Sequence, residues 1–442
     1  MNGSRQRLIL FTRYPLPGKV KTRLIPTLGA EGAAALQRRL LLRTFRAALG
    51  ACAAAGAELE IRFDGGDAKA FKSWLGNGFV SRPQGDGDLG QRMARAFEDS
   101  FQEGSQGTVI IGSDCPELTS DRLTAAFERL ALATVVFGQA YDGGYYLIGL
   151  TRFIPELFEG IPWGTETVLA DSKRALAPRN MTPALLEPLP DLDVPEDFQD
   201  WQRLIESEEG GPQRVSVIIP ALNEAEHIAA TLESARCDNP HEVFVVDGGS
   251  TDDTTQRART AGARVVESSP GRAWQMNAGA ARATGNLLLF LHADTVLPDN
   301  WARVVQETLG QPGIVAGAFG FRIDADFAGK WFVEWTTNLR SRWWQLPYGD
   351  QGLFLRRSVF EELGGFADVA IMEDYEFVRR LRRRGRIVTL SQKAITSGRR
   401  WKRLGFLRAT WINKRMVAGY HLGQPAAKLA EIYAQTSHDR KR

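Results

Sequence analysis

The sequence predicts two α/β domains in tandem, each with a mostly parallel sheet flanked by helices. Both halves open in the same way: an apolar strand (residues 7–11 and 215–220) is followed by a Pro-containing turn and then a helix. Strands and helices alternate after each opening, and such alternation is typical of parallel sheets. Continuous apolar runs such as residues 243–246 are typical of strands covered on both faces.

The first domain is expected to span residues 1–205. A Leu- and Ala-rich helix over residues 32–49 follows the first strand, and further strands are expected over residues 58–63 and 108–111. Residues 206–213 are acidic and then rich in Gly and Pro, which indicates a linker.

The second domain is expected to span residues 214–442. After its first strand the pattern predicts a helix over residues 224–235. Further strands are expected over residues 242–246, 264–266 and 286–291.

Composition excludes several classes of protein. The formal net charge is only +3, which argues against a nucleic-acid binder. The three cysteines are far apart, as expected in a reducing compartment and not in a disulfide framework or zinc site. The start shows no signal peptide, and the apolar run 287–291 is too short to span a bilayer. We therefore expect a cytoplasmic protein, with peripheral contact at the inner membrane face left open.

Polar residues follow three strands of the second half. Ligands in open α/β sheets sit at the carboxyl ends of the strands, so these tips are candidates for a binding site. A carboxylate at the third tip is a hard oxygen ligand suited to Mg²⁺ or Mn²⁺, which would bridge a diphosphate. Any one tip alone reads as a turn or a helix cap, whereas three on consecutive strands favour a ligand site. The tips hold Pro220, Leu222 and Glu224; then Asp247 and Gly248; then His292 and Asp294.

These segments resemble the family 2 glycosyltransferases of the GT-A fold, a Rossmann-like fold. Residues 215–224 look like the opening motif of that family, and residues 246–252 like its nucleotide-contacting turn. Residues 271–279, with Asn277, resemble the segment near the nucleotide ribose, and residues 290–294 stand where the family has its DxD motif. The resemblance implies a nucleotide-sugar donor, a divalent cation and a small-molecule or lipid acceptor.

Two departures qualify the resemblance. His292 replaces the first Asp of DxD, and imidazole suits Mn²⁺ better than Mg²⁺, so Asp294 is expected to carry the metal with His292 beside it. Second, the LHADT and GDQGLFLRR segments resemble the transferases linked with arsenosugar biosynthesis and radical-SAM/selenodomain neighbourhoods, and more loosely the carotenoid-acid glycosyltransferases.

The resemblance also implies the catalytic groups. The segment Gly364-Gly365-Phe366 followed by Glu373-Asp374 matches the acceptor-side motif of the family. It makes Asp374 the general base for inverting transfer, with Glu373 beside it; the alternative is that both cap the following helix. Arg399 and Arg400 are candidates for a cationic clamp, against the simpler possibility of a solvated face.

The tail from residue 401 to 433 mixes aromatic residues with Lys and Arg. Basic amphipathic helices can rest on anionic lipid, so these C-terminal helices are a candidate for peripheral membrane contact. Packing over the acceptor cleft is the alternative.

The first domain carries its own candidate site. Arg13, Gly18, Lys21 and Arg23 lie in a basic Pro/Gly turn after the first strand, a plausible phosphate cradle although not a Walker A loop; an exposed basic loop is the alternative. Asp114 stands at a second strand tip, and Asp142 and Asp193 lie in later acidic turns; Asp114 and Asp193 form a candidate metal pair.

These segments resemble the nucleotidyltransferases of the phospholactate-guanylyltransferase and molybdenum-cofactor type, in the DUF2064-type branch with PGxxKTRL, GSDCP and DGGYYLIGL. In that fold group an Asp matching Asp114 and an Asp matching Asp193 hold the metal, while Val194 replaces a usual Thr. Nucleotidyl and glycosyl transfer both remain open for this domain.

The sequence thus predicts a glycosyltransferase of hexosyltransferase type, with a nucleotidyltransferase-like domain that would supply its donor. Two alternatives stand beside it. One is a nucleotide-binding regulatory or scaffold protein with an inactive domain, and the other is a peripheral membrane lipid glycosyltransferase.

Overall fold

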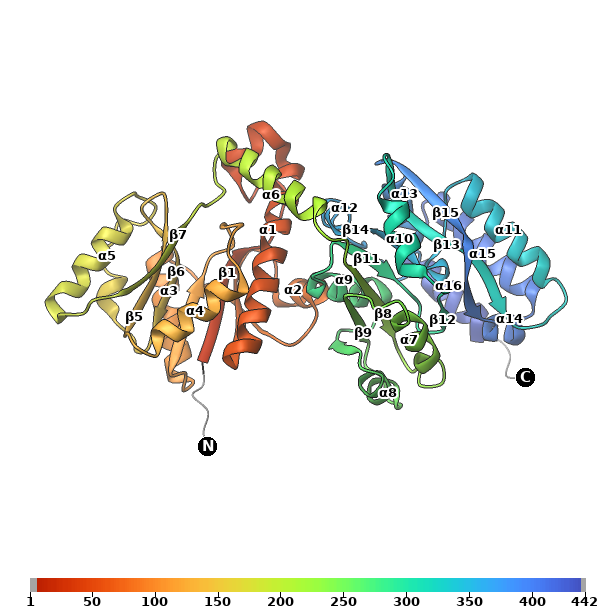
Figure 1. Cartoon of the computed structure of the whole chain (residues 1–442), viewed down its shortest axis with the longest axis horizontal. Helices are drawn as coiled ribbons and strands as arrows, with labels where there is room; N and C mark the ends of the chain where they lie inside the picture. Colours follow the sequence, from red (N-terminus) through yellow and green to blue (C-terminus); the bar gives the residue numbers. More distant parts are fainter. Residues whose placement is uncertain (1–5, 439–442) are drawn as a thin grey trace. The chain divides into compact units, whose positions relative to one another are not determined.

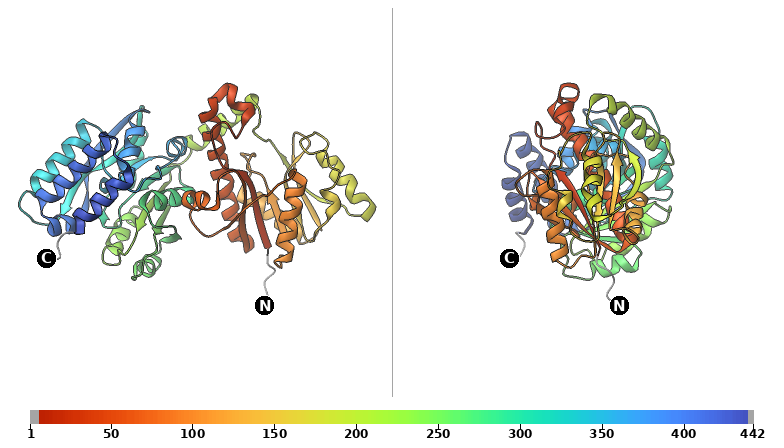
Figure 2. Two further views of the ribbon diagram at one scale, coloured as in Figure 1. Left: turned by 180° about the vertical axis from the view of Figure 1, so that it is seen from behind. Right: turned by 90° about the vertical axis from the view of Figure 1, so that its left-hand side faces the viewer.

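The computed structural model describes residues 6–438 and divides into two compact units (Figure 1). The first holds the residues up to 71 together with 78–208, and the second holds 72–77 together with the residues from 209 on. Each is an α/β layer structure with helices against a central sheet, as Figure 2 shows from two further sides. This confirms the predicted fold class.

The first unit is built on a seven-stranded sheet in the order β3-β2-β1-β4-β6-β5-β7. Pairing is parallel from β3 to β4, and only β6 runs antiparallel to its neighbours β4 and β5. The strands are β1 (Gln6–Arg13), β2 (Ala57–Asp64), β3 (Val80–Pro83), β4 (Gly107–Ile111), β5 (Val135–Ala140), β6 (Tyr145–Leu150) and β7 (Ala184–Leu189). The helices are α1 (Ile25–Ala55), α2 (Ala68–Leu75), α3 (Leu89–Gln102), α4 (Ser120–Leu130), α5 (Val168–Leu176) and α6 (Phe198–Gly210).

The predicted linker is partly helical. Helix α6 continues to Gly210, so the acidic part of the 206–213 stretch extends a helix and only the residues after it are irregular. The helix expected over residues 32–49 lies within α1 (Ile25–Ala55), which is interrupted by a kink at Gly29, where φ is 71°.

The second unit is built on an eight-stranded sheet in the order β10-β9-β8-β11-β14-β13-β15-β12. Strands β10 to β11 are parallel, and β14 and β12 run antiparallel to their neighbours. The strands are β8 (Val215–Ala221), β9 (Glu242–Asp247), β10 (Arg264–Glu267), β11 (Leu287–Phe290), β12 (Thr295–Val296), β13 (Ile314–Asp324), β14 (Leu353–Arg356) and β15 (Arg386–Ser397).

Ten helices of the second unit cover this sheet or extend beyond it. They are α7 (Ile228–Arg236), α8 (Thr254–Thr260), α9 (Arg272–Arg282), α10 (Trp301–Leu309), α11 (Lys330–Trp343), α12 (Arg357–Glu362), α13 (Glu373–Leu381), α14 (Arg399–Leu404), α15 (Phe406–His421) and α16 (Ala426–His438).

The core of the second unit explains why its strand tips are well placed. All seven residues of β8 and all six of β9 are buried, and alternate side chains join two apolar clusters on opposite faces of the sheet. Burial of this kind stabilises by about 25 cal/mol per Å² of apolar surface. The polar residues that follow each strand are thereby fixed at one edge. No helix within residues 6–438 is long and apolar enough to cross a membrane.

Candidate active site

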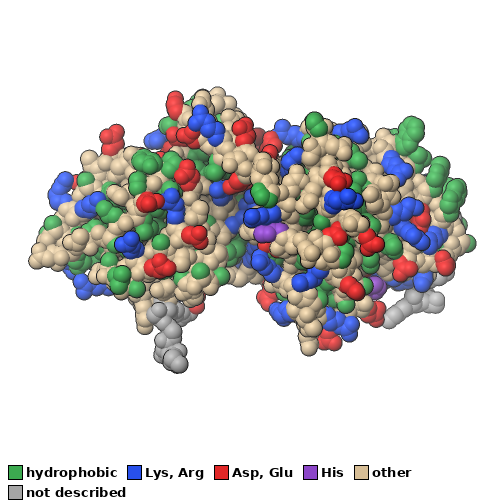
Figure 3. All heavy atoms as spheres, in the orientation of Figure 1, with side chains coloured by type: hydrophobic (Ala, Val, Ile, Leu, Met, Phe, Trp, Pro, Cys, Tyr) green, Lys and Arg blue, Asp and Glu red, His purple; other side chains and the backbone are tan. Residues whose placement is uncertain are grey.

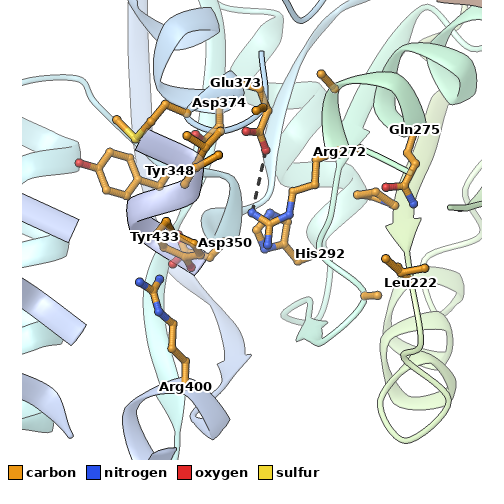
Figure 4. A pocket seen from close by; sticks show the side chains of 18 of the residues that line it. Leu222, Arg272, Gln275, His292, Tyr348, Asp350, Glu373, Asp374, Arg400 and Tyr433 are labelled. Atoms are coloured by element: carbon orange, nitrogen blue, oxygen red, sulfur yellow. Dashed lines mark ion pairs between the residues drawn. The ribbon is translucent and has the colours of Figure 1, made fainter. Parts of the chain in front are cut away.

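A cleft of about 1260 Å³ opens in the second unit along the ends of β8 and β11 (Figure 4). One wall comes from β8 and the start of α9, and the opposite wall from α13 and the C-terminal helices. Pro220, Leu222, Glu224, His292, Asp294, Glu373, Asp374, Arg399 and Arg400 all line it, so the structure brings most of the predicted second-domain residues together.

Three of the predicted residues are not among those that line the cleft. Asp247 accepts hydrogen bonds from the backbone N–H groups of Gly249 and Ser250, both at 3.0 Å, and so shapes its own turn together with Gly248. The amide of Asn277 is used at both ends, since it accepts from Phe366 N–H and donates to Phe366 O, each at 2.9 Å. Asn277 therefore braces the Gly364–Phe366 segment.

In the cleft, the carboxylate of Asp294 lies beside the guanidinium of Arg399. Its Oδ2 is 3.1 Å from Nη2 of Arg399, and the same guanidinium grips the carboxylate of Glu224, with Nη1 2.7 Å from Oε2. Burial raises the pKa of Asp294, and the charge of Arg399 opposes that rise. Glu224, at the end of the first strand, is therefore joined to Asp294 through Arg399.

His292 is a neutral imidazole in this setting. Burial, together with the charges of Arg272 and Arg399, lowers its pKa to about 3. A Cβ atom placed on Gly349 would lie 2.7 Å from His292 Nε2 and 3.3 Å from Asp374 Oδ2, so these two side chains converge on one glycine. Only glycine leaves the space between them free.

The donor chemistry of this centre suits a divalent cation of the Mn²⁺ type. Asp294 offers a carboxylate and His292 a neutral nitrogen, both of which Mn²⁺ accepts. In the described part of the chain no three His, Cys, Asp or Glu side chains converge as a complete metal cage. Any cation at Asp294 would have to compete with Arg399, whose Nη2 lies 3.1 Å from Oδ2 of that carboxylate.

The acceptor-side carboxylates begin helix α13. Met372, immediately before them, is left-handed with φ of 70°, a conformation that costs a non-glycine residue about 1–2 kcal/mol. Asp374 accepts hydrogen bonds from Gly349 N–H at 2.8 Å and Tyr375 N–H at 2.7 Å. Glu373 is buried, which raises its pKa to about 7, and its Oε1 lies 3.9 Å from Arg272 Nη1.

Sequence reasoning missed several residues of the cleft. Gln275 donates to the carbonyls of Ala221 and Val246 at 2.7 and 2.8 Å and so ties α9 to two strand ends. Arg272 and Asp350 also line the cleft, and burial raises the pKa of Asp350 to about 6. Arg272 follows the helix-opening Gly271 and Asp350 lies in the GDQG segment, but only the fold shows that both line one cleft.

The first unit brings its predicted residues together in a different way. The ammonium of Lys21 lies 2.6 Å from Asp114 Oδ1, 3.0 Å from Asp193 Oδ1 and 2.6 Å from the carbonyl oxygen of Leu192. Burial would lower the pKa of Lys21, but the two carboxylates outweigh it and raise that pKa. Three acceptors use all three N–H bonds of Lys21, which the sequence had placed on a phosphate.

Lys21 thus lies within ion-pair distance of both carboxylates that the sequence predicted as a metal pair. The other predicted residues of this unit lie apart from that contact or at its edge. Arg13 is 3.5 Å from Asp64, Arg23 is 3.6 Å from Asp193, and both are largely exposed. Gly18 has φ of 75° in the turn, and Asp142 accepts from Gly144 N–H at 2.9 Å in an exposed turn.

The second unit is the part of the chain that matches known glycosyltransferases. A family model described as "Glycosyl transferase family 2" matches residues 216–364, and one described as "Uncharacterized protein conserved in bacteria (DUF2064)" matches residues 48–165. The "Uncharacterized glycosyltransferase Rv1514c" of Mycobacterium tuberculosis is 33% identical over 181 residues, which are 38% of this chain and 68% of the relative. The chain belongs to glycosyl transferase family 2 through its second unit, and it carries a DUF2064 segment in its first.

Other relatives cover less of their own length. The glucosyl-3-phosphoglycerate synthase of Mycolicibacterium smegmatis is 35% identical over 100 residues, 19% of this chain and 32% of the relative. The chain thus spans about a third of the length of the curated relatives it matches first. Among solved structures, a putative nucleotide-diphospho-sugar transferase from Desulfovibrio desulfuricans G20 is 32% identical, with 47% of this chain and 90% of that chain covered and a TM-score of 0.42.

Proposed function

We propose that the second unit transfers a sugar from a nucleotide-sugar donor to a hydroxyl of a small-molecule or lipid acceptor, with inversion at the anomeric carbon. The observation that carries this proposal is that one cleft is lined by Leu222 at the end of β8, by Asp294 and by Asp374. The matched family and the glycosyltransferase relatives support the same reaction class. The protein would act in the cytoplasm.

Asp374 is the proposed general base. The acceptor oxygen forms a bond to the anomeric carbon while the bond from that carbon to the diphosphate oxygen breaks. The diphosphate leaves with the electron pair, and the acceptor proton passes to the carboxylate of Asp374. Two backbone N–H groups, of Gly349 and Tyr375, hold this carboxylate in one orientation.

Positive charge on the cleft wall that holds Asp294 would compensate the negative charge on the departing diphosphate. Arg272 and Arg399 both line the cleft and place two guanidinium groups near that carboxylate. Asp294 with His292 would hold a divalent cation, Mn²⁺ in preference to Mg²⁺, which supplies further charge compensation when bound.

For the first unit we propose nucleotide handling without a metal between Asp114 and Asp193. Lys21 already pairs with both carboxylates, and the exposed side chains of Arg13 and Arg23 could also contact phosphate oxygens. Nucleotidyl transfer to a sugar 1-phosphate would supply the donor of the second unit. The LHADT and GDQGLFLRR segments favour a role of the arsenosugar type for the whole chain.

A donor screen tests the main proposal. The full chain is incubated with a panel of UDP- and GDP-sugars and Mn²⁺, and release of nucleoside diphosphate is measured. Release from one or a few donors is expected. If no donor is consumed, whether by hydrolysis or by transfer, the second unit is not a transferase and the scaffold alternative takes its place.

One surface favours a lipid acceptor as a second candidate. Helix α11 exposes Trp331, Phe332, Trp335 and Trp343, and Trp331 stacks on Trp335 with ring centroids 6.0 Å apart. Figure 3 shows hydrophobic side chains gathered over this helix. Residues 399–421 carry seven Arg or Lys and no acidic residue, as expected for contact with anionic lipid.

Vesicle co-sedimentation tests the lipid alternative. The full chain should bind vesicles containing phosphatidylglycerol at low salt and lose that binding when Trp331, Trp335 and Trp343 are changed together to Ala. Leu132→Ala, a change at a residue 89% exposed in the first unit, is the matched control. Absence of binding by the wild type at low salt would remove the lipid candidate.

A further inference from the structure

Two buried polar atoms at one end of the cleft have no partner. They are Oδ1 of Asp350 and Nε of Arg400, and neither has a hydrogen bond to any residue in the range 6–438. Both residues line the cleft together with Tyr433, and Figure 4 shows the three side chains on the same side of it. Buried donors and acceptors are nearly always paired in native proteins, so this end of the cleft is built for a polar ligand.

The Arg400 guanidinium is held in place for such a ligand. Its Nη2 donates to Asn413 Oδ1 at 2.8 Å, and its Cζ lies 5.0 Å from the centre of the Tyr433 ring. These two contacts fix the plane of the group while Nε stays unused. Arginine in a fixed orientation suits an oxyanion, because its N–H groups match the geometry of phosphate and carboxylate.

The charge at this end favours a phosphate. Arg403 lines the same part of the cleft as Arg400, and helix α14, which carries both, has four Arg or Lys residues and no acidic one. Two guanidinium groups complement a group with more than one negative charge. The apolar side chains of Met416, Val417 and Ala430 also line the cleft.

The opposite polar group lies next to the proposed base. Asp350 follows Gly349, whose N–H donates to Asp374 at 2.8 Å, so the two carboxylates flank one backbone step. A carboxylate oxygen that has no partner can accept a hydrogen bond from a hydroxyl group. A ligand that reaches Arg400 while presenting a hydroxyl to Asp374 therefore passes Asp350, where a second hydroxyl would be held.

We propose that the acceptor is a polyol phosphate ester, with its phosphate on Arg400 and Arg403 and its hydroxyl groups on Asp350 and Asp374. This inference rests on the proposed function and names the acceptor class of the same cleft. The phosphate ester can come from a free metabolite or from a glycerophospholipid headgroup, and the experiment below separates the two.

The test uses the full chain and sn-glycerol 3-phosphate, with glycerol as its neutral counterpart. Calorimetric titration should show binding of the phosphate ester at least about tenfold tighter than that of glycerol, since a hydrogen bond to a charged group is lost with glycerol. Arg400→Gln should weaken phosphate-ester binding about ten- to a hundredfold and remove the preference over glycerol.

Matched variants separate recognition from folding. Lys402→Gln changes an exposed cation on the same helix that does not line the cleft, so it should bind like the wild type. Arg403→Gln, whose side chain is also exposed, should weaken binding in the same direction as Arg400→Gln even if the latter unfolds. Equal binding by the wild type, Arg400→Gln and Arg403→Gln overturns the proposal.

A lipid arm identifies the source of the ester. The same proteins are sedimented with vesicles of phosphatidylcholine alone or with added phosphatidylglycerol, and sugar transfer into the lipid fraction is measured. Transfer to sn-glycerol 3-phosphate alone indicates a soluble acceptor, and transfer to phosphatidylglycerol indicates the headgroup. If neither probe binds, the inference fails; if the probe binds but no donor is consumed, the proposed function fails and the binding site stands.

Discussion

Nη2 of Arg399 lies 3.1 Å from Oδ2 of Asp294, so the carboxylate proposed to hold a metal already carries a protein cation. The same arginine is anchored by Glu224, whose Oε2 accepts from Nη1 at 2.7 Å. A divalent cation at Asp294 must share the carboxylate with Arg399 or displace it. Metal affinity and this ion pair are therefore opposed.

Removing the cation should strengthen metal binding. Arg399→Gln leaves the charge of Asp294 uncompensated, so the affinity of the full chain for Mn²⁺ should rise about tenfold, as expected for the loss of one nearby positive charge. Mn²⁺ titration followed by electron paramagnetic resonance measures this. Asp294→Asn should abolish the same binding, and an unchanged affinity in Arg399→Gln would contradict the competition.

Loss of the proposed base should slow transfer without weakening the donor. Asp374→Asn keeps the shape and the contact with Gly349 N–H through its amide oxygen, but it cannot take up the acceptor proton. We expect kcat for transfer to fall about 10²- to 10⁴-fold with donor KM nearly unchanged. Asp326→Asn, at a fully exposed carboxylate, is the control. Full activity in Asp374→Asn would exclude this residue as the base.

The contact of Lys21 should stabilise the first unit. Lys21→Met removes a buried ammonium from two carboxylates that are about half exposed, with side-chain exposures of 50% and 46%. Solvent screening reduces the effect, and we expect a loss of about 2 kcal/mol in the free energy of unfolding. Urea unfolding measures it, and hydrogen exchange should rise around Leu192, whose carbonyl Lys21 holds. Lys19→Met, at an exposed residue of the same turn, should change neither.

The raised pKa of Glu373 should make the stability of the folded protein depend on pH. Burial raises its pKa from 4.5 to about 7, so its neutral form is favoured in the folded state. Between these two values the folded protein binds more protons than the unfolded chain, and this group lowers the stability as the pH rises. Glu373→Gln removes that slope. Its stability relative to the wild type should therefore increase between about pH 5 and about pH 8, by up to about 1.4 kcal/mol per pH unit.

The measurement is the free energy of urea unfolding of both proteins at several pH values. Glu362→Gln, at a half-exposed carboxylate paired with Arg384, is a suitable control. Parallel pH profiles for the wild type and Glu373→Gln would contradict a raised pKa at this position.

The sequence was sufficient for the parallel half of each sheet and for the strand tips. Runs such as residues 215–220 and 243–246 are continuously apolar, which predicts strands buried on both faces, and they are buried in the structure. The antiparallel strands were less visible, because β12 and β14 are short and because the partners of these strands and of β6 are set by tertiary packing. The helical end of the predicted linker was missed because Glu206–Gly210 continues the amphipathic α6.

Within the site, residues at strand ends were predictable and residues on long connections were not. Asp294 follows a strand directly and lines the cleft as expected. Asn277 matched a motif, yet its amide is used to brace Phe366. Asp350 and Tyr433 were not singled out, because each is close to Arg400 in space but far from it in the chain.

Left-handed Met372 sets the start of helix α13 and thus the position of Asp374. Glycine would adopt this conformation without strain, so Met372→Gly would relieve part of the local backbone energy. It would also make the start of helix α13, which positions the carboxylates of Glu373 and Asp374, more flexible. If Asp374 is the base, a glycine here should therefore slow turnover while it relieves backbone strain, a stability–activity trade-off at a single backbone angle.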